Sequence, residues 1–552
     1  MHIAALKLIF KSYPVKTTLV VLASLLGSLT EGLALFLLFP LLRASLNSPN
    51  LDSSNNSSAH LLPEALTGLA LEQVLIVYLM LLTLISIITW ARVYLSSSIQ
   101  ASYILNSRRE IIEGQLFSKA EFFTSNRSEK TLYSCGEKLS EASSFIFLLL
   151  DLLVSIVLII GLLILSAIAN PILTILAIII ALVNLFLLRK LVYKNHIIGV
   201  KLLAGNEMLL IHTKDLFSNY RRIWSSGRHQ LVAKEANTLS KELSGLIRSA
   251  GRNQADLKAM ASLFGGASLA AVCYLAISIL GLNWTIAATC LLLIARVISR
   301  CSSAQQNFQF LNELAPAWQQ TLDFKQEIAK HRVKEFSPAK PSSSAFESIK
   351  FENVEYESPD YGREKIGPFS LKIRPAELVL ISGTTGVGKS TFCDIVSGVL
   401  KNTVGNISID GNILESASAL RGLVAYVPQT SSLISGSIRS NLEFFGPKLS
   451  EQKMQEALEL VGLSHRIEDV DYLPGESGSK LSGGEKQRLV IAQALLMEKP
   501  VLIIDESTSG LDEILELEIL SRIREKYPQI SILLISHRSH LRSSVDRIIE
   551  FQ

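Results

Sequence analysis

Long apolar runs fill the first 300 residues of the chain, whereas short apolar runs alternate with polar segments after about residue 345. A bilayer core about 30 Å thick requires about 20 apolar residues in a helix. Six runs meet or approach that length and predict an all-α transmembrane domain over residues 1–332, with spans at about 17–42, 73–95, 145–168, 171–193, 258–280 and 284–300. Six buried helices of a large soluble protein are the alternative, which the length of the runs disfavours.

Cations flank these runs unevenly, which predicts their orientation. The connections between spans two and three and between spans four and five are rich in Lys and Arg, whereas those on the opposite side are nearly free of them. Because cytoplasmic loops carry the excess of cations, both termini are predicted to be cytoplasmic. The two basic connections resemble helices that extend past the membrane, joined by short crosswise segments near residues 122–128 and 213–219.

Composition agrees with a membrane protein and excludes several other classes. The 552 residues are 49% hydrophobic and 18% charged, against about 25% charged in ordinary soluble domains. The net charge of +4 gives no reason to expect nucleic acid as a partner. The five cysteines are scattered, without the spacing of a disulfide framework or a zinc site.

A linker rich in Pro and Ser is predicted at residues 333–348, and the pattern changes after it. From 349 to 552, β-branched runs alternate with helical segments, which predicts an α/β domain with a parallel sheet. The apolar run 378–381 leads into GxxxxGK[ST], a phosphate-binding loop between a strand and a helix. Its residues are the predicted nucleotide ligands: Gly383, Thr384, Thr385, Gly386, Val387, Gly388, Lys389, Ser390 and Thr391.

The chemistry of the loop follows from these residue types. Glycines let backbone N–H groups and the helix N-terminus face phosphate oxygens. Lys389 is expected to reach the β- and γ-phosphates and the Ser390 hydroxyl to bind Mg²⁺. A second apolar run, 501–504, ends in Asp505 and Glu506. At the carboxyl edge of a parallel sheet, Asp505 is expected to hold Mg²⁺, and Glu506 to orient and deprotonate the attacking water.

The segment 481–488, LSGGEKQR, resembles the signature of ABC transporters, in which LSGGQ is usual. The resemblance implies further roles. Gln429 matches the glutamine that senses Mg²⁺, and His537 the switch histidine that contacts the γ-phosphate. Ser482 and Gly484 would reach the γ-phosphate of a second chain, and residues 509–512 match the D-loop.

The resemblance covers the whole chain and implies a half-transporter of the type IV exporter fold, a six-helix membrane domain before a P-loop NTPase domain. It implies ATP and Mg²⁺ as cofactors and two composite sites in a dimer within the lipid bilayer. A homodimer is expected, with a heterodimer as the alternative. The two crosswise segments resemble coupling helices. The half-transporter length and the absence of organelle targeting signals favour a bacterial inner membrane, with a eukaryotic membrane as the alternative.

The place where the family stacks adenine on an aromatic ring is occupied by Ser358. Tyr356 or Tyr361 is expected to substitute for it. Because stacking contributes about 1–3 kcal/mol per base, the replacement predicts weaker ATP binding and not a loss of hydrolysis.

The predicted function is ATP-driven export of an amphipathic or peptide-like substrate by alternating access. A flippase for a lipid-linked saccharide or lipid is the alternative, and a membrane-bound ATP sensor that transports nothing is a third class. Charged side chains within the bilayer are costly and by default functional. Those that either contact cargo or pair with neighbouring helices are Glu31, Arg92, Asp151, Arg296 and Arg300.

Overall fold

The computed structural model divides into two compact units, Met1–Ser118 with Asn126–Arg332 and Lys119–Ser125 with Val333–Gln552. The residues that the structure describes are 2–37, 71–125, 128–169, 171–279, 284–333, 346–357, 365–384, 386–414, 418–446, 448–464, 469–475, 478–506, 508 and 510–551.

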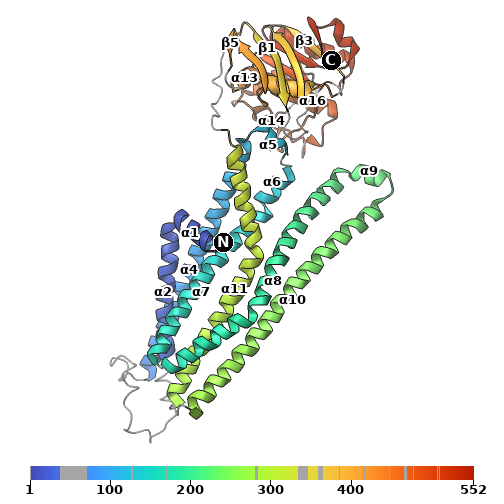
Figure 1. Cartoon of the computed structure of the whole chain (residues 1–552). Coiled ribbons are helices and arrows are strands. Elements are labelled where there is room, and N and C mark those ends of the chain that lie inside the picture. Colours follow the sequence, from blue (N-terminus) through green and yellow to red (C-terminus); the bar gives the residue numbers. More distant parts are fainter. Residues whose placement is uncertain are drawn as a thin grey trace. The chain divides into compact units, whose positions relative to one another are not determined.

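Helices build the first unit (Figure 1). Four of them contain 46 to 48 residues, so each is about 70 Å long at 1.5 Å per residue and exceeds the bilayer core more than twofold. The helices of this unit are α1 (His2–Ser12), α2 (Pro14–Phe36), α4 (Leu71–Leu116), α6 (Ser128–Cys135), α7 (Glu137–Ala169), α8 (Pro171–Ser218), α9 (Tyr220–Ser225), α10 (His229–Tyr274) and α11 (Trp284–His331).

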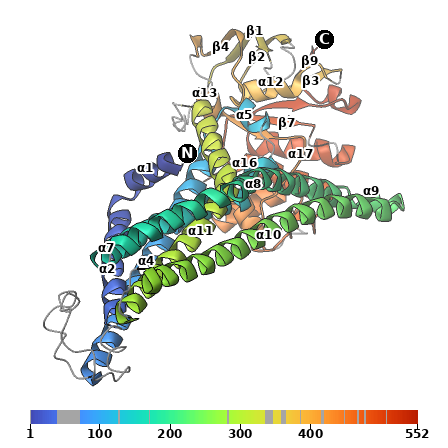
Figure 2. The same ribbon diagram turned by 60° about the horizontal axis from the view of Figure 1, so that its bottom comes forward.

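Helix α11 packs along α7 and α8, and α2 packs along α4 and α7. Helices α8 and α10 lie side by side and meet at the short α9 (Figure 2). Proline marks two of the helix starts, Pro14 and Pro171, since it lacks the N–H that the first turn leaves unpaired. The core contains Phe145, which stacks on Trp318 at 5.2 Å between ring centroids.

Four helices of the described part are long and apolar enough to cross a membrane: Pro14–Ala34, Glu72–Leu116, Thr131–Ile168 and His229–Ser278. They overlap four of the predicted spans. The other two predicted spans, 171–193 and 284–300, lie in α8 and α11, where many side chains are outside the described residues. The count of six spans therefore stays a prediction.

The crosswise segments differ from expectation in position. The first predicted segment, 122–128, overlaps helix α5 (Ala120–Ser125), which groups with the second unit. The second prediction, 213–219, was wrong, because α8 continues to Ser218 and the short helix α9 follows it. No Gly or Pro interrupts α8 there, so nothing in that stretch stops the helix.

Two sheets form the second unit. The parallel sheet has the order β6-β7-β8-β3-β9 and the antiparallel sheet the order β2-β1-β4-β5. Their strands are β1 (Ile349–Glu357), β2 (Lys365–Ile373), β3 (Leu378–Gly383), β4 (Val404–Ile409), β5 (Asn412–Ile413), β6 (Val424–Val427), β7 (Val501–Asp505), β8 (Ser531–Ile535) and β9 (Arg547–Phe551).

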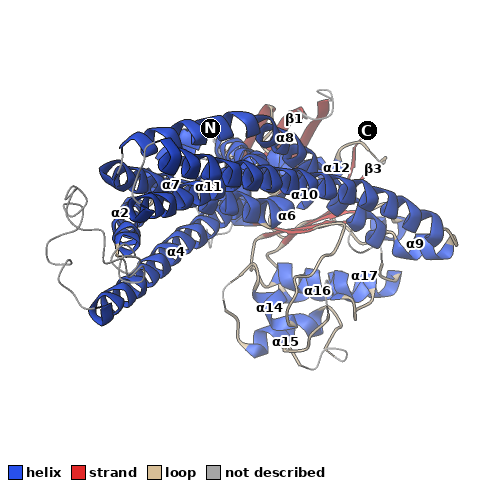
Figure 3. Cartoon of the chain, turned by 90° about the horizontal axis from the view of Figure 1, so that it is seen from below, coloured by secondary structure: helices blue, strands red, loops and turns tan. Residues whose placement is uncertain are grey.

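The helices of this unit divide between two hydrophobic cores, one on each face of the parallel sheet. One core joins the sheet to α14, α15, α16 and α17, which Figure 3 shows grouped together. The other joins it to α12 and the antiparallel sheet. The bounds are α12 (Lys389–Val396), α13 (Ser418–Leu423), α14 (Ile438–Glu443), α15 (Glu451–Leu460), α16 (Gly483–Leu495) and α17 (Glu513–Lys526).

The predicted fold class is confirmed in its helical first part and its α/β second part, but the antiparallel sheet was not predicted. Every residue of β7 and β8 is buried, so these strands are apolar runs that sequence reasoning recognises. Strand β1 alternates buried and exposed positions around a register shift, which blurs its period of two.

Candidate functional site

The phosphate-binding loop connects the buried strand β3 to α12. Two of its glycines have left-handed backbones, Gly386 with φ 91° and Gly388 with φ 96°. A Cβ on Gly388 would lie 2.1 Å from the Cγ2 atom of Ile366, so a larger residue does not fit there. Thr385 lies outside the described residues. The remaining predicted loop residues, Gly383, Thr384, Val387, Ser390 and Thr391, follow one another around the turn.

The ammonium group of Lys389 lies inside this loop. Its Nζ atom donates to the carbonyl oxygens of Gly383 at 2.9 Å and Thr384 at 3.0 Å, and the residue is only 6% exposed. A buried ammonium needs such acceptors. Phosphate oxygens are stronger acceptors than carbonyls, because a charged acceptor roughly doubles the strength of a hydrogen bond. The loop therefore presents a cation whose present partners a phosphate can replace.

Asp505 ends strand β7 beside the loop and is 2% exposed. Tyr426 donates its hydroxyl to the Asp505 Oδ2 atom at 3.1 Å, and Ser390 also hydrogen-bonds to this carboxylate. Burial raises the pKa of Asp505, and these two hydrogen bonds oppose the rise. A carboxylate beside the Ser390 hydroxyl provides the hard oxygen ligands that Mg²⁺ prefers, so the residues present fit this ion.

Glu506 is held between the two other predicted catalytic residues. The Gln429 amide donates to Glu506 Oε2 at 2.7 Å, and the Nε2 atom of His537 lies 3.1 Å from Glu506 Oε1. The backbone of Glu506 is left-handed, with φ 49°, which costs free energy in a residue other than glycine. Its N–H donates to the carbonyl of Ile535 in the neighbouring strand. The structure thus brings together three residues separated by up to 108 positions in the sequence.

The signature segment begins helix α16. The Ser482 hydroxyl accepts from the N–H of Glu485 at 3.2 Å, and the Glu485 carboxylate accepts from the N–H of Ser482 at 2.7 Å. This capping box satisfies two N–H groups at the helix start. It gives the Glu that replaces the usual Gln a local structural role. Gly484 approaches the carbonyl of Gly510 so closely that a Cβ would lie 3.2 Å from its oxygen.

The predicted adenine contact is not presented to a ligand. Tyr356 is 6% exposed and belongs to the core between the two sheets. A base could stack on this ring only after the ring left the core. The other candidates, Ser358 and Tyr361, lie outside the described residues.

Tyr426 is a site residue that sequence reasoning missed as a contact. It occupies strand β6, which pairs in parallel with β7. The sequence signal that could have identified Tyr426 is its position next to the carboxyl end of β6, because parallel strands end at the same edge of a sheet.

Charged side chains also meet within the membrane-type helices of the first unit. Arg300 donates to both carboxylate oxygens of Glu31, at 3.0 and 3.2 Å, and Arg296 lies 3.8 Å from the same carboxylate. Asn307 donates to Asp151 Oδ2 at 2.6 Å. Glu31 and Asp151 are thus paired with α11.

One further charged group, Arg92, belongs to this cluster. Arg92 lies within electrostatic range of Asp151, Arg300 and Glu31. Asn307 was not predicted, although it follows Arg296 and Arg300 at helical spacing on α11.

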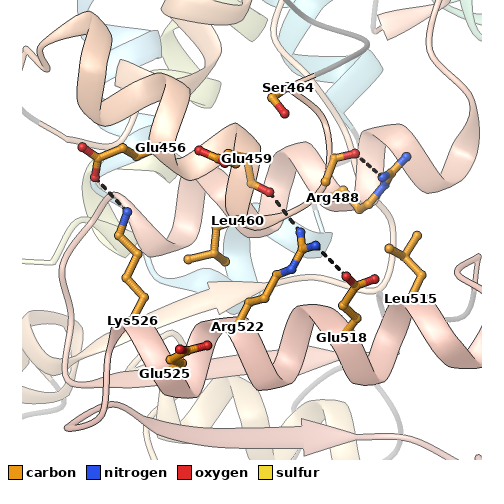
Figure 4. Close-up of a pocket in the computed structure, with 11 residues that line it drawn as sticks. Glu456, Glu459, Leu460, Ser464, Arg488, Leu515, Glu518, Arg522, Glu525 and Lys526 are labelled. Carbon is orange, nitrogen blue, oxygen red and sulfur yellow. Dashed lines mark hydrogen bonds and ion pairs between the residues drawn. The ribbon is translucent and has the colours of Figure 1, made fainter.

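A hollow of about 990 Å³ in the second unit is lined by α15, α16 and α17 (Figure 4). Its charges are largely satisfied within the protein, with Lys526 on Glu456 at 2.8 Å and Arg522 on Glu518 at 2.5 Å. None of the predicted nucleotide ligands lines it. We therefore assign no ligand to it.

Comparisons with known proteins agree with this geometry. Residues 366–509 match the sequence family described as ABC transporter. The glutathione/L-cysteine transport system ATP-binding/permease protein CydC of Escherichia coli is 34% identical over 195 residues, which are 35% of this chain and 34% of that protein. The ATP-dependent lipid A-core flippase of Desulfotalea psychrophila is 33% identical over 239 residues, 41% of this chain and 40% of that protein. The alignments thus cover well under half the length of these curated relatives.

A solved structure extends the likeness to the whole chain. The structure of a bacterial Atm1-family ABC exporter with ATP bound superposes with a TM-score of 0.74 and 18% identity, over 98% of this chain and 94% of that one. At this identity the likeness establishes the fold. The chain therefore carries an ABC transporter domain and has the fold of an ABC exporter, with fused membrane and nucleotide-binding domains.

Proposed function

We propose that this chain is one half of an ATP-driven exporter that moves an amphipathic or peptide-like substrate out of the cytoplasm or inner leaflet. The observation that carries the proposal is the position of Glu506, which is held by Gln429 and His537 at the end of β7. A carboxylate at this edge of the sheet, next in sequence to Asp505, supports a role for Glu506 as the general base for a water that attacks the γ-phosphate.

The phosphate loop would bind ATP through its backbone N–H groups and Lys389. Ser390, Asp505 and Gln429 would hold Mg²⁺, which neutralises negative charge on the phosphates when bound. Glu506 would accept a proton from the attacking water, and His537 would donate to the γ-phosphate. Gln429 and His537 now occupy the two Glu506 oxygens, so nucleotide binding would exchange these hydrogen bonds for new ones.

A second copy would complete each nucleotide site. The N-terminus of α16 carries the partial positive charge of a helix start, which attracts phosphate. Ser482 and Glu485 fix this turn through the capping box, which supports a role for Ser482 and Gly484 at the γ-phosphate of the partner. Because every proposed hydrolytic residue is present in one sequence, a homodimer suffices, with both sites competent.

Short helices between the long ones would transmit movements of the nucleotide-binding domains to the membrane domain. Helix α5 groups by its contacts with the nucleotide-domain unit, which supports the proposed role of the first connection as a coupling helix. Trp224 on α9 is 65% exposed and is available for a similar contact. We place the protein in a bacterial inner membrane with cytoplasmic termini, in agreement with its basic connections.

The charge pairs within the membrane-type helices affect which residues are available to contact the cargo. Since Glu31 is paired with Arg300 and Asp151 with Asn307, the two carboxylates are weaker candidates for cargo contact than Arg296. The Arg296 side chain remains 55% exposed. An exposed guanidinium within the predicted span 284–300 supports the second candidate function, flipping of a lipid with an anionic headgroup. The lipid A-core flippases among the relatives agree with it.

Removing the proposed base tests hydrolysis. We expect Glu506→Gln to lower the ATPase rate of the purified chain by about 100-fold or more, while ATP binding persists, because glutamine keeps the shape but cannot accept the proton. Glu525→Gln, an exposed position on α17, is the matched control and should leave the rate unchanged. Wild-type rates in the Glu506 variant would refute the assignment, and a wild-type chain without ATPase activity would favour the ATP sensor.

The half-buried Asp394 near Asp505 predicts that the stability of the fold depends on pH. Burial, followed by the charge of Asp505, raises the pKa of Asp394 from 3.8 to about 6. The folded chain therefore binds a proton that the unfolded chain has released, and stability falls as the pH rises toward 6. We expect Asp394→Asn to raise the free energy of unfolding by about 1 kcal/mol at pH 8, and by less at pH 5.

Thermal melting of nucleotide-free protein in EDTA at both pH values measures this difference. The control variant Glu525→Gln should show no pH-dependent gain in melting temperature. If the melting temperature of the Asp394 variant shifts equally at the two pH values, the electrostatic explanation is contradicted.

Cargo is tested by native mass spectrometry of Lys389→Ala protein extracted gently from its own membrane. Without ATP-driven closure this variant should retain endogenous cargo, and we expect a peptide or small amphipathic compound. A co-purifying lipid-diphosphate saccharide would overturn that expectation and identify Arg92, Arg296 and Arg300 as candidate headgroup ligands.

A further inference from the structure

A buried carboxylate lies behind the proposed catalytic residues. Glu516, in the first turn of α17, is 0% exposed. Two cationic or potentially cationic groups from the segment after β8 approach its Oε2 atom, Arg538 at 2.8 Å and His540 at 2.9 Å. Desolvating a carboxylate is costly, and these two hydrogen bonds offset part of that cost.

Arg538 makes a second hydrogen bond from the same nitrogen. Its NH1 atom donates to the carbonyl oxygen of Leu511 at 2.9 Å. Leu511 belongs to the segment 509–512 that leads from β7 into α17 and resembles the D-loop. One guanidinium therefore joins the segment after β8 to the segment before α17.

Both joined segments contain residues of the proposed site. Arg538 directly follows His537, which contacts Glu506. Next to Leu511, the Gly510 N–H donates to the side chain of Gln487 in α16, the helix that Ser482 caps. A movement of His537 can thus pass through Arg538 to Leu511 and on to the signature helix.

We propose that Arg538, fixed by Glu516, is a positioning residue that aligns His537 with Glu506 and couples that alignment to the segment 510–512. The proposal rests on the proposed function, since it assumes hydrolysis at Glu506. Arg538 acts through His537 and the Leu511 carbonyl and touches no reacting atom. A guanidinium suits this role, because its planar donors have fixed directions that an ammonium lacks.

A purely structural role of the buried pair predicts a different outcome and can be separated. Replacing a buried ion pair with apolar residues of similar size often preserves stability. In the double variant Glu516→Leu with Arg538→Met, His540 loses Glu516 but keeps its contact with Glu513 at 3.4 Å. This variant should therefore fold, yet it lacks the hydrogen bond to Leu511.

The experiment compares steady-state ATPase kinetics, ATP affinity and melting temperature for the purified full chain. For Arg538→Lys and for the double variant we expect kcat to fall by about tenfold or more, with KM and ATP affinity within about threefold of wild type. Arg542→Ala is the matched control. Arg542 lies in the short 3-10 helix Ser539–Ser543 that follows Arg538, and it pairs with the exposed Glu550. The kcat of the Arg542 variant should therefore be unchanged.

A double variant that melts like the wild type and has the wild-type kcat would overturn the proposal, because the buried pair would then serve folding alone. A parallel loss of ATP affinity would overturn it as well. If the wild-type chain shows no ATPase activity, the proposed function fails instead, and the two failures are distinguishable.

Discussion

The shared edge of strands β3 and β7 is the constraint on which the nucleotide site depends. Strand β3 leads into the phosphate loop and β7 ends at Asp505, which Glu506 follows, while β8 lies between the two strands. Because all these strands are parallel and buried, their carboxyl ends deliver a cation, a buried carboxylate and a partly exposed one to one place. The left-handed backbone of Glu506 then turns the second carboxylate away from the sheet and toward Gln429 and His537.

Lys389, Glu506 and Glu31 already have partners within the protein. Lys389 is bonded to carbonyls of its own loop, Glu506 to Gln429 and His537, and Glu31 to Arg300. A ligand at any of these places must replace a partner. Binding therefore changes which segments hold one another, and this exchange is the differential interaction that a conformational change requires. We infer that ATP acts on this chain by such exchanges.

Much of the site could be predicted from the sequence because its signals are local. The phosphate loop, Asp505 with Glu506, and the signature at Ser482 are short segments whose strand and helix context is readable along the chain. Partners distant in sequence were not predictable. Glu31 and Arg300 are 269 residues apart, and the hydrophobic period of each helix shows only that both residues face inward. Tyr356 was expected to contact adenine because an aromatic residue was required near that place, but burial depends on packing that the local sequence does not specify.

The most direct test of the central claim, that two copies complete each nucleotide site, is complementation between two inactive variants. Lys389→Ala removes the phosphate loop's cation and Ser482→Arg blocks the signature helix, so each variant alone should hydrolyse no ATP. Co-expressed in one membrane, mixed dimers should contain one intact composite site and recover roughly a quarter of the wild-type ATPase rate, as random pairing in a two-fold symmetric dimer implies. Activity that stays at zero in the mixture, or a Ser482→Arg variant that is active alone, would contradict the account.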